Sequence, residues 1–421
     1  MQTLIQNADL LGEGTLLDVL IDDGVIVALG RGLAHQDGAT ILDADRQTLL
    51  PGLIDVHVHY REPGFEQKET IATGAAAAAH GGFTTTLAMP NLDPVPDTVD
   101  HLMPLLAKNA SDAKIHVRQF ASLTQGRSGN TLVDFQALHD AGAIGFSDDG
   151  SGIQNALTMY QAMQAAAKVD APIAAHIEDA SLMQGGVMNA GRIADELGLK
   201  GIINQSESSQ LARDLDLAAA TGVHYHACHI STRQSVELIR AAKKQGVNVT
   251  AEVSPHHLLL DETDIHKDDP MMKMNPPLRS RADHLALIEG LADGTLDLIA
   301  TDHAPHTAAD KAGSMATAAF GIVGSETAFA TLYTQFVESK MFTLAQLINW
   351  MSTNPATLFN LPGGRIAVGA PADLTLVDLT TPYTIDAADF LSKGKNSPFI
   401  GREVRGKVRL TLAGGQIAYQ A

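Results

Sequence analysis

The chain has 421 residues, of which 45% are hydrophobic and 37 are glycine, and its formal net charge at pH 7 is −19. This composition is that of a globular protein, and the length exceeds one ordinary domain. The negative charge disfavours nucleic acid and anionic membranes as partners, because both would be repelled at long range. Cys228 is the only cysteine, which excludes an intrachain disulfide and a thiolate zinc cluster. The chain shows neither a signal-like N-terminus nor a run of ~18 apolar residues, so we expect a cytoplasmic protein.

Short strands and turns are predicted at both ends of the chain. The first part contains apolar, β-branched runs at residues 17–21, 25–29, 40–42 and 48–50, and the last part contains runs at 373–377, 408–412 and 416–419. Each terminal part is too small to bury much core alone. We therefore expect residues 1–51 and 363–421 to pair into one small β-sandwich domain.

Between them, in residues 52–362, short apolar runs alternate with helical stretches such as residues 153–168 and 233–244. This alternation is typical of βα units around a parallel sheet. The eight predicted strands end near His59, Met89, Ala121, Ser147, His176, His229, Val253 and Asp302. Eight such units predict an α/β fold of the (β/α)8 TIM-barrel type, whose active site lies at the carboxyl ends of the strands.

The first barrel strand ends in a pair of histidines, His57 and His59. Side chains alternate faces along a strand, so both imidazoles point the same way. Two neutral imidazoles on one face can form half of a metal site. Pro63 and Gly64 then end the strand, which puts the pair at its mouth.

Further candidate ligands follow other predicted strands. Asp149, His176, His229 and Asp302 all lie at strand ends. Each alone would be an ordinary surface or turn residue, but all of them at one barrel mouth suit one or two divalent ions of the zinc type. Asp148 competes with Asp149 for the role of ligand.

Four segments resemble the signature segments of the dihydroorotases, a family of the amidohydrolase superfamily. They are Asp-Val-His-Val-His-Tyr-Arg-Glu-Pro-Gly at 55–64, Ala-Met-Pro-Asn at 88–91, Met-Asn-Pro-Pro-Leu-Arg at 274–279 and Ala-Thr-Asp-His-Ala-Pro-His at 300–306. The resemblance extends over nearly the whole chain. It implies reversible, zinc-dependent cyclisation of N-carbamoyl-L-aspartate to L-dihydroorotate, the third step of pyrimidine (UMP) synthesis.

The resemblance also implies roles for the candidate ligands. His57, His59 and Asp302 would bind a buried ion, and His176 and His229 a more exposed one. Asp149 stands where many relatives have a bridging carboxylated lysine, which resembles the class I branch of the family. Metal occupancy varies within that branch, so the number of ions stays open. Asp302 would also serve as the catalytic proton shuttle.

Substrate contacts are implied in the same way. Arg61 lies two residues past His59, and its planar fork can bind a carboxylate through two parallel hydrogen bonds. The resemblance adds Asn91 and His306 to that carboxylate site, and Asn275, Phe320 and Gly321 to the ring site. Relatives usually have proline where this chain has Ala319, which puts substrate affinity in doubt. Residues 306–315 predict a mobile loop near the mouth.

Two other functions compete with this interpretation. One is another cyclic-amide hydrolase, of the hydantoinase or allantoinase type, against which Asp149 and Arg61 both argue. The other is a non-catalytic paralogue that scaffolds a partner enzyme, but such paralogues have typically lost metal ligands, and all the candidate ligands are retained here. We expect a small-molecule substrate and no nucleic acid or membrane partner, and the sequence leaves a homodimer open.

Overall fold

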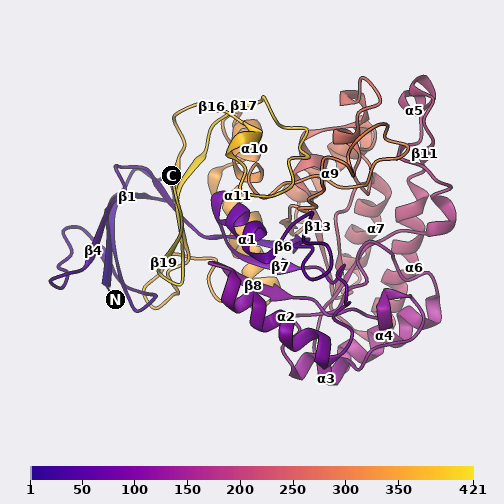
Figure 1. The fold of residues 1–421 in the computed structure, drawn as a ribbon, viewed down its shortest axis with the longest axis horizontal. Coiled ribbons are helices and arrows are strands. Elements are labelled where there is room, and N and C mark those ends of the chain that lie inside the picture. The colour runs from indigo at the N-terminus through magenta and orange to yellow at the C-terminus, as the bar shows by residue number, and fades with distance from the viewer. Residues whose placement is uncertain (1) are drawn as a thin grey trace.

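The computed structural model describes residues 2–421. Figure 1 shows a β layer at one side of the molecule, containing both chain ends, and a larger body in which helices surround parallel strands. None of the helices in the described part of the chain is long and apolar enough to cross a membrane.

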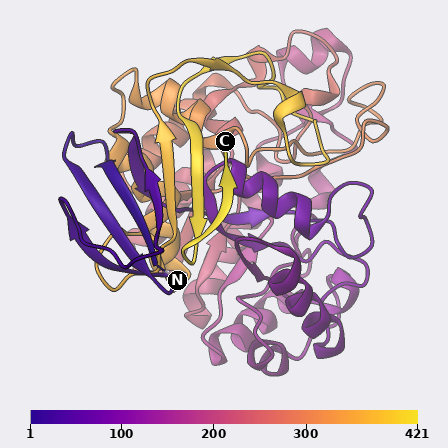
Figure 2. The ribbon, with the colours of Figure 1, turned by 60° about the vertical axis from the view of Figure 1, so that its left-hand side comes forward.

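The β layer is one eight-stranded sheet built from both ends of the chain, in the order β19-β18-β15-β5-β1-β2-β3, with β4 paired to β1. Its strands are β1 (Gln2–Leu10), β2 (Leu16–Asp22), β3 (Val25–Gly30), β4 (Thr40–Asp43), β5 (Thr48–Pro51), β15 (Leu374–Asp378), β18 (Lys407–Ala413) and β19 (Gln416–Gln420). The two ends join where β15 runs antiparallel to β5. Ile5, Val19, Leu374 and Leu412 share one buried cluster, so the N-terminal and C-terminal strands have a common core (Figure 2).

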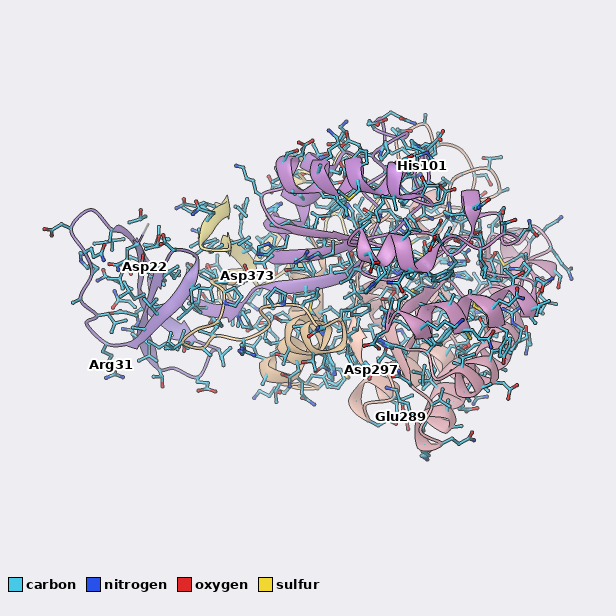
Figure 3. The ribbon with its side chains drawn as sticks, turned by 90° about the horizontal axis from the view of Figure 1, so that it is seen from below. Asp22, Arg31, His101, Glu289, Asp297 and Asp373 are labelled. Atoms are coloured by element: carbon cyan, nitrogen blue, oxygen red, sulfur yellow. The ribbon has the colours of Figure 1, made fainter. Side chains whose placement is uncertain are left out.

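The sheet meets the larger body near Asp373, just before β15. This buried carboxylate accepts a hydrogen bond from the backbone N of Gly414 at 2.7 Å and lies 3.0 Å from Nε2 of His116 on β8 (His116–Gln119). Figure 3 shows Asp373 between the two parts, whereas Asp22 and Arg31 lie among the outer strands.

The larger body is a closed parallel barrel, which confirms the predicted fold class. One sheet contains β6 (Leu53–Val58), β7 (Phe83–Ala88) and β8. The other contains β9 (Ile173–Ala175), β12 (Tyr225–Ala227), β13 (Val249–Val253) and β14 (Leu298–Ile299). Parallel bridges from Phe146 to Ala121 and to Ile173, and from Val58 to His303, close the ring.

The fourth strand is shorter than the sequence predicts. In place of a strand ending at Ser147, only Phe146 pairs with both neighbours. The chain turns directly afterwards because the Asp148 carboxylate accepts hydrogen bonds from the backbone N of Leu123 at 2.8 Å and of Thr124 at 3.2 Å. That turn aims the next residue into the barrel.

Helices follow most of the strands. The longer ones are α1 (Ile71–His80), α2 (Val99–Asp112), α4 (Ala156–Lys168), α6 (Gln205–Thr221), α7 (Arg233–Lys244) and α9 (Arg281–Ala292), and the shorter ones are α3 (Phe135–Asp140), α5 (Arg192–Leu197), α8 (Pro255–Leu259), α10 (Ala328–Leu332), α11 (Leu344–Ile348) and α12 (Asn354–Leu358). The predicted helix at 153–168 begins only at Ala156, because the Asn155 side chain accepts from the backbone N of Leu157 and Thr158 and so caps it.

Part of the C-terminal region leaves the β layer and covers the barrel beside its mouth. It includes the antiparallel pair β16 (Tyr383–Thr384) and β17 (Glu403–Val404). In the middle region of the chain, β10 (Met188–Asn189) and β11 (Gly201–Ile202) form a separate parallel pair. Phe390 and Phe399 share a buried cluster with Met315 and Ile322, which follow β14. This segment therefore supports the loops that form one wall of the mouth.

Candidate active site

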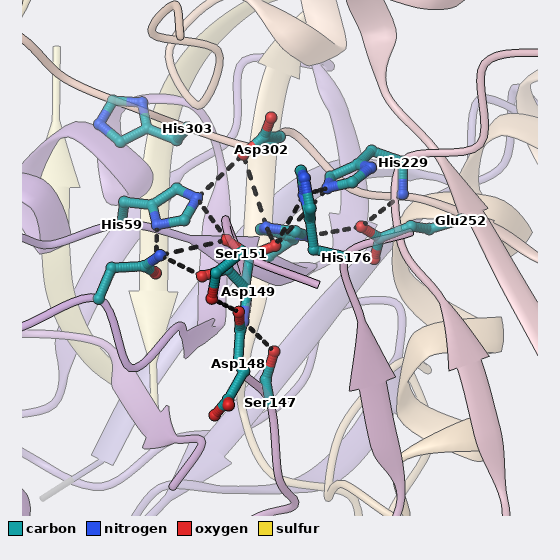
Figure 4. A network of polar contacts seen from close by, with 12 residues as sticks. His59, Ser147, Asp148, Asp149, Ser151, His176, His229, Glu252, Asp302 and His303 are labelled. Atoms are coloured by element: carbon teal, nitrogen blue, oxygen red, sulfur yellow. Dashed lines mark hydrogen bonds and ion pairs between the residues drawn. The ribbon is translucent and has the colours of Figure 1, made fainter. Parts of the chain in front are cut away.

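The histidine pair at the end of β6 points into the barrel. His57 is fully buried and His59 is 6% exposed, and alternation sends Val56 and Val58 to the apolar clusters on the opposite face. The other candidates arrive from neighbouring strands: His176 follows β9, His229 follows β12 and Asp302 follows β14. Figure 4 shows His59, His176, His229 and Asp302 gathered around Asp149.

Asp149 lies at the centre of the cluster. Its Oδ1 lies 3.5 Å from Nε2 of His57 and 3.6 Å from both Nδ1 of His176 and Nε2 of His229. Its Oδ2 lies 3.5 Å from Nε2 of His59. Oδ1 of Asp302 lies 3.0 Å from Nε2 of His59 and 3.5 Å from Nε2 of His57.

These residues fit a divalent metal ion. Nε2 of His57 and Oδ1 of Asp149 are buried and have no hydrogen-bond partner, which is costly unless another group satisfies them. Two ligands about 2.1 Å from a tetrahedral ion lie about 3.4 Å apart, close to the separations found here. Ligand atoms meet in two sets that share Asp149, one with His57 and His59 and one with His176 and His229.

Charges in the cluster also suit a cation. Burial alone would raise the pKa of Asp149, but His57, His176 and His229 outweigh it and hold that pKa well below its ordinary value. Burial likewise opposes ionisation of Asp302, yet His59 and His57 lower its pKa to about 2. Burial and the nearby Arg61 lower the pKa of His59, so its ring stays neutral. The carboxylates act on His176 in the opposite sense: burial opposes its protonation, but Asp149 and Glu178 raise its pKa to about 10. A metal ion binds the neutral imidazole, so a bound cation would take the place of this proton beside the ionised carboxylates.

Glu252 on β13 was missed by sequence reasoning. Its Oε1 lies 2.6 Å from Nδ1 of His57 and accepts a hydrogen bond from the backbone N of His229 at 3.1 Å, and its Oε2 lies 3.0 Å from Nε2 of His226. Burial by itself would lower the pKa of His57, but Glu252 and Asp149 raise it well above its ordinary value. A carboxylate of this kind fixes the tautomer and orientation of a ligating imidazole. The available signal was a charged residue inside a short strand that contains two valines and an alanine.

Glu178 was missed as well. It lies two residues after His176, with its Oε2 3.4 Å from Nε2 of that histidine, and it accepts a hydrogen bond from Nδ2 of Asn275 at 2.6 Å. Glu178 lies two residues past His176, just as Arg61 lies two residues past His59. This spacing could have identified Glu178 from the sequence.

The structure distinguishes the two neighbouring aspartates. The Asp148 carboxylate bonds the Leu123–Thr124 backbone and points away from the histidines, whereas that of Asp149 faces them (Figure 4). Asn91 fixes the backbone of Asp149, because its Nδ2 donates a hydrogen bond to the Asp149 carbonyl oxygen at 2.6 Å. Oδ1 of Asn91 lies 3.0 Å from Nδ1 of His59, so this amide also orients a second candidate ligand.

A pocket of about 190 Å³ opens above the cluster. It is lined by His59, Arg61, Asn91, Asp149, Gly150, His176, His229, Asn275, Asp302, Ala304, Phe320 and Gly321. Nε of Arg61 is buried there without a hydrogen-bond partner, so the guanidinium can receive an anion. His57 and His306 are not among the lining residues. His57 is fully buried, and Nε2 of His306, which is 7% exposed, lies 2.7 Å from the Phe320 carbonyl oxygen.

The fold and this site define a class, the cyclic amide hydrolases of the amidohydrolase superfamily. The L-hydantoinase (dihydropyrimidinase) from Arthrobacter aurescens superposes with a TM-score of 0.88 at 27% identity, over 99% of this chain and 96% of that one. The dihydropyrimidinase from Brevibacillus agri has the same fold, with a TM-score of 0.86 at 24% identity over 100% and 95% of the two chains.

Sequence similarity identifies the family within that class. Residues 46–235 match the family model described as dihydro-orotase-like. The dihydroorotase of Lactiplantibacillus plantarum is 58% identical over 424 residues, and that of Ligilactobacillus salivarius is 55% identical over 425 residues. Each comparison covers 100% of this chain and 99% of the relative. The chain belongs to the dihydroorotase family.

Proposed function

We propose that the chain catalyses the reversible cyclisation of N-carbamoyl-L-aspartate to L-dihydroorotate in cytoplasmic pyrimidine synthesis. One observation carries the proposal. Nε of Arg61 has no hydrogen-bond partner in the pocket, and Nε2 of His57 and Oδ1 of Asp149 have none in the cluster beside it. A carboxylate-binding cation thus lies beside a metal-binding cluster. Identity to dihydroorotases is 58%, against 27% to the hydantoinase, which favours this substrate over a hydantoin.

The proposed cofactor is zinc. His57, His59 and Asp302 would hold one ion, His176 and His229 would hold a second where two are bound, and Asp149 would lie between them. A bound divalent ion supplies a Lewis acid that polarises a carbonyl group and acidifies water. Glu252 and Asn91 hold His57 and His59 in place for it.

Asp302 is the proposed catalytic acid and base. It lines the pocket, and although burial opposes ionisation, His59 and His57 lower its pKa to about 2, so the carboxylate is ionised at neutral pH. In hydrolysis the carboxylate would take a proton from the attacking water and deliver it to the departing ring nitrogen. In cyclisation it would take the ureido proton as that nitrogen attacks the side-chain carboxylate, and would give the proton to the carboxylate oxygen that leaves as hydroxide.

Arg61 is the proposed anchor for the free carboxylate of the substrate. The overall charge of −19 repels anions, so binding one needs a local cation, and the guanidinium supplies it. Asn91 and His306 are proposed to share this carboxylate, and Asn275, Phe320 and Gly321 to contact the ring. The proposed organic substrate is small enough for the pocket. A homodimer is also proposed, but none of these residue roles depends on it.

Hydrolysis assays on the purified protein test the function. We expect turnover of L-dihydroorotate, loss of that turnover after exhaustive chelation, and its return on addition of zinc. Hydantoin and allantoin serve as matched cyclic amides that lack the carboxylate for which Arg61 is proposed. Faster turnover of either one than of dihydroorotate would contradict the substrate assignment, and full turnover in a verified metal-free sample would contradict the metal site.

A further inference from the structure

Lys311 carries a buried ammonium in the segment that follows β14. The residue is 3% exposed, and its Nζ donates hydrogen bonds to the carbonyl oxygens of Lys273 at 3.1 Å, Ala319 at 2.9 Å and Gly321 at 2.9 Å. An ammonium has three donors, so the full capacity of this group is used on backbone carbonyls. Residues 306–315, for which the sequence predicts a mobile loop, therefore contain an internal anchor.

The three carbonyls belong to two walls of the pocket. Ala319 and Gly321 flank Phe320, and Lys273 lies two residues before Asn275, and the pocket is lined by Asn275, Phe320 and Gly321. The two walls also contact each other, because the backbone N of Gly321 donates to the Lys273 carbonyl at 3.1 Å. One ammonium thus connects both walls to the chain segment that begins at His306.

Lys273 strengthens the same arrangement from the opposite wall. Its Nζ donates to the Ala318 carbonyl at 2.6 Å and lies 4.2 Å from the centre of the Phe320 ring. Together the two lysines bond the carbonyls of Ala318, Ala319 and Gly321, so their hydrogen bonds span the backbone around Ala319. Since alanine lacks the ring by which proline restricts φ, hydrogen bonds must fix this backbone instead.

Burying an ammonium is expensive unless its donors are satisfied, and here three backbone carbonyls satisfy all of them. We propose that Lys311 is a positioning residue, which holds the Ala319–Gly321 backbone and the Asn275 segment at the separation that the substrate ring requires. The proposal rests on the proposed function of the pocket. Lys311 contacts neither the candidate metal ligands nor the space where substrate would lie, so its effect is on binding geometry.

The test compares Lys311→Met with Lys243→Met in the full-length, zinc-loaded protein. Lys243 on α7 also donates three hydrogen bonds, to the Gly294 carbonyl and to both carboxylate oxygens of Asp297, far from the pocket. We expect Lys311→Met to raise KM for dihydroorotate by about tenfold or more, with kcat changed less and zinc content unchanged, since small misplacements of binding groups cost rate steeply. Lys243→Met should leave KM unchanged.

Should Lys311→Met fail to fold, Lys311→Arg keeps the charge and replaces the compact ammonium with a planar fork that cannot reach the three carbonyls in the same way. It should fold and still raise KM. A KM within twofold of wild type in either folded variant would overturn the proposal. If Arg61→Met also leaves KM unchanged, the proposed substrate pocket itself is wrong; if only the Lys311 variants do, the positioning role alone is wrong.

A pH profile provides a second readout that a merely structural role would not move. Burial, with Lys273 adding to it, lowers the pKa of Lys311 to about 8, and the charged or titratable groups that face it are Lys273, Asp269 and His306. Burial and the surrounding cations lower the pKa of His306 to about 3, so that ring does not titrate in the same range. Above pH 8 Lys311 loses its proton and one donor, so wild-type KM should rise there, whereas KM of Lys311→Arg should not. Identical profiles would overturn the proposal.

Discussion

Two aspartates flank the same barrel strand and have opposite environments. Asp297 directly precedes β14, and Asp302 follows it at the other end of the barrel. Both oxygens of Asp297 accept from Nζ of Lys243, at 2.6 and 2.7 Å, and Oδ2 also accepts from the backbone N of Ala251 at 2.8 Å. Asp302 contacts two histidines that belong to a cluster with unpaired buried atoms.

The difference separates stability from function in one strand. At the amino end of β14 the carboxylate is matched by partners from the protein, so it joins α7 and β13 to the start of β14. At the carboxyl end the protein leaves polar atoms of His57 and Asp149 without partners, which is the arrangement of a site that awaits a ligand. Figure 3 labels Asp297 at the outside of the barrel, whereas Asp302 lies in the cluster of Figure 4.

The largest effect is expected from Asp302→Asn. An amide cannot accept the proton of the attacking water, and loss of general acid-base catalysis typically lowers kcat ~10²–10⁴-fold. Steady-state kinetics with parallel zinc analysis measure it. An enzyme within a few-fold of wild type, with unchanged zinc, would place the proton shuttle on another residue and remove the contrast with Asp297.

Arg61→Met should lower kcat/KM for dihydroorotate about 10–100-fold, because hydrogen bonds to charged groups contribute ~1.5–3 kcal/mol each. The zinc content should not change, since the proposed contact is to substrate. Loss of bound zinc in this variant would show that Arg61 supports the metal cluster instead.

Glu252→Gln should weaken zinc binding about 10–100-fold, the usual cost of losing a partner that orients a metal ligand. Competition with a chelator of known affinity measures the change. Asp373→Asn is the control, because Asp373 is also a buried carboxylate that bonds a histidine and a backbone amide, but at the junction with the β layer. It contacts one histidine where Glu252 contacts two. Equal zinc affinity in the two variants would contradict the orienting role of Glu252.

The smallest effect on activity is expected at the amino end of the strand. Asp297→Asn should leave kcat and KM unchanged while lowering the free energy of unfolding by about 1–2 kcal/mol, since the partly exposed ion pair with Lys243 is lost. Urea denaturation measures the stability. A large loss of activity without a loss of stability would mean that Asp297, at the amino end of β14, also contributes to catalysis.

The sequence predicts the fold class and most elements because hydrophobic periodicity is local. Residues 233–244 form α7 with the predicted bounds, and the strands around His59, His176 and His229 end within two residues of their predicted positions. The fourth strand failed because a side-chain contact from Asp148 to the Leu123–Thr124 backbone, distant in sequence, ends it early.

The residues of the candidate site also fall into two groups, those that the sequence could identify and those that it could not. Residues at strand ends could be found, because parallel strands bring their carboxyl ends together. Glu252 and Lys311 could not be assigned, because each acts through partners that only the tertiary structure brings near. Glu252 meets His57 across 195 positions in the chain, for example. Glu178, two residues past His176, could have been found from its spacing. The sequence placed His306 and Asn91 near the candidate site, but it could not predict the hydrogen bonds that orient their side chains.

The central claim is that Asp149 provides the carboxylate that the metal-binding cluster shares. The most direct test is to add zinc back to the metal-free protein. A carboxylated lysine forms only when carbon dioxide is available, whereas Asp149 carries its own carboxylate, held ionised by the surrounding histidines, which keep its pKa low even though burial opposes this. Apo-protein given zinc in carbonate-free buffer should regain the same dihydroorotate turnover as apo-protein given zinc with bicarbonate. Recovery that depends on bicarbonate would contradict the account, because a lysine and not Asp149 would then bridge the site.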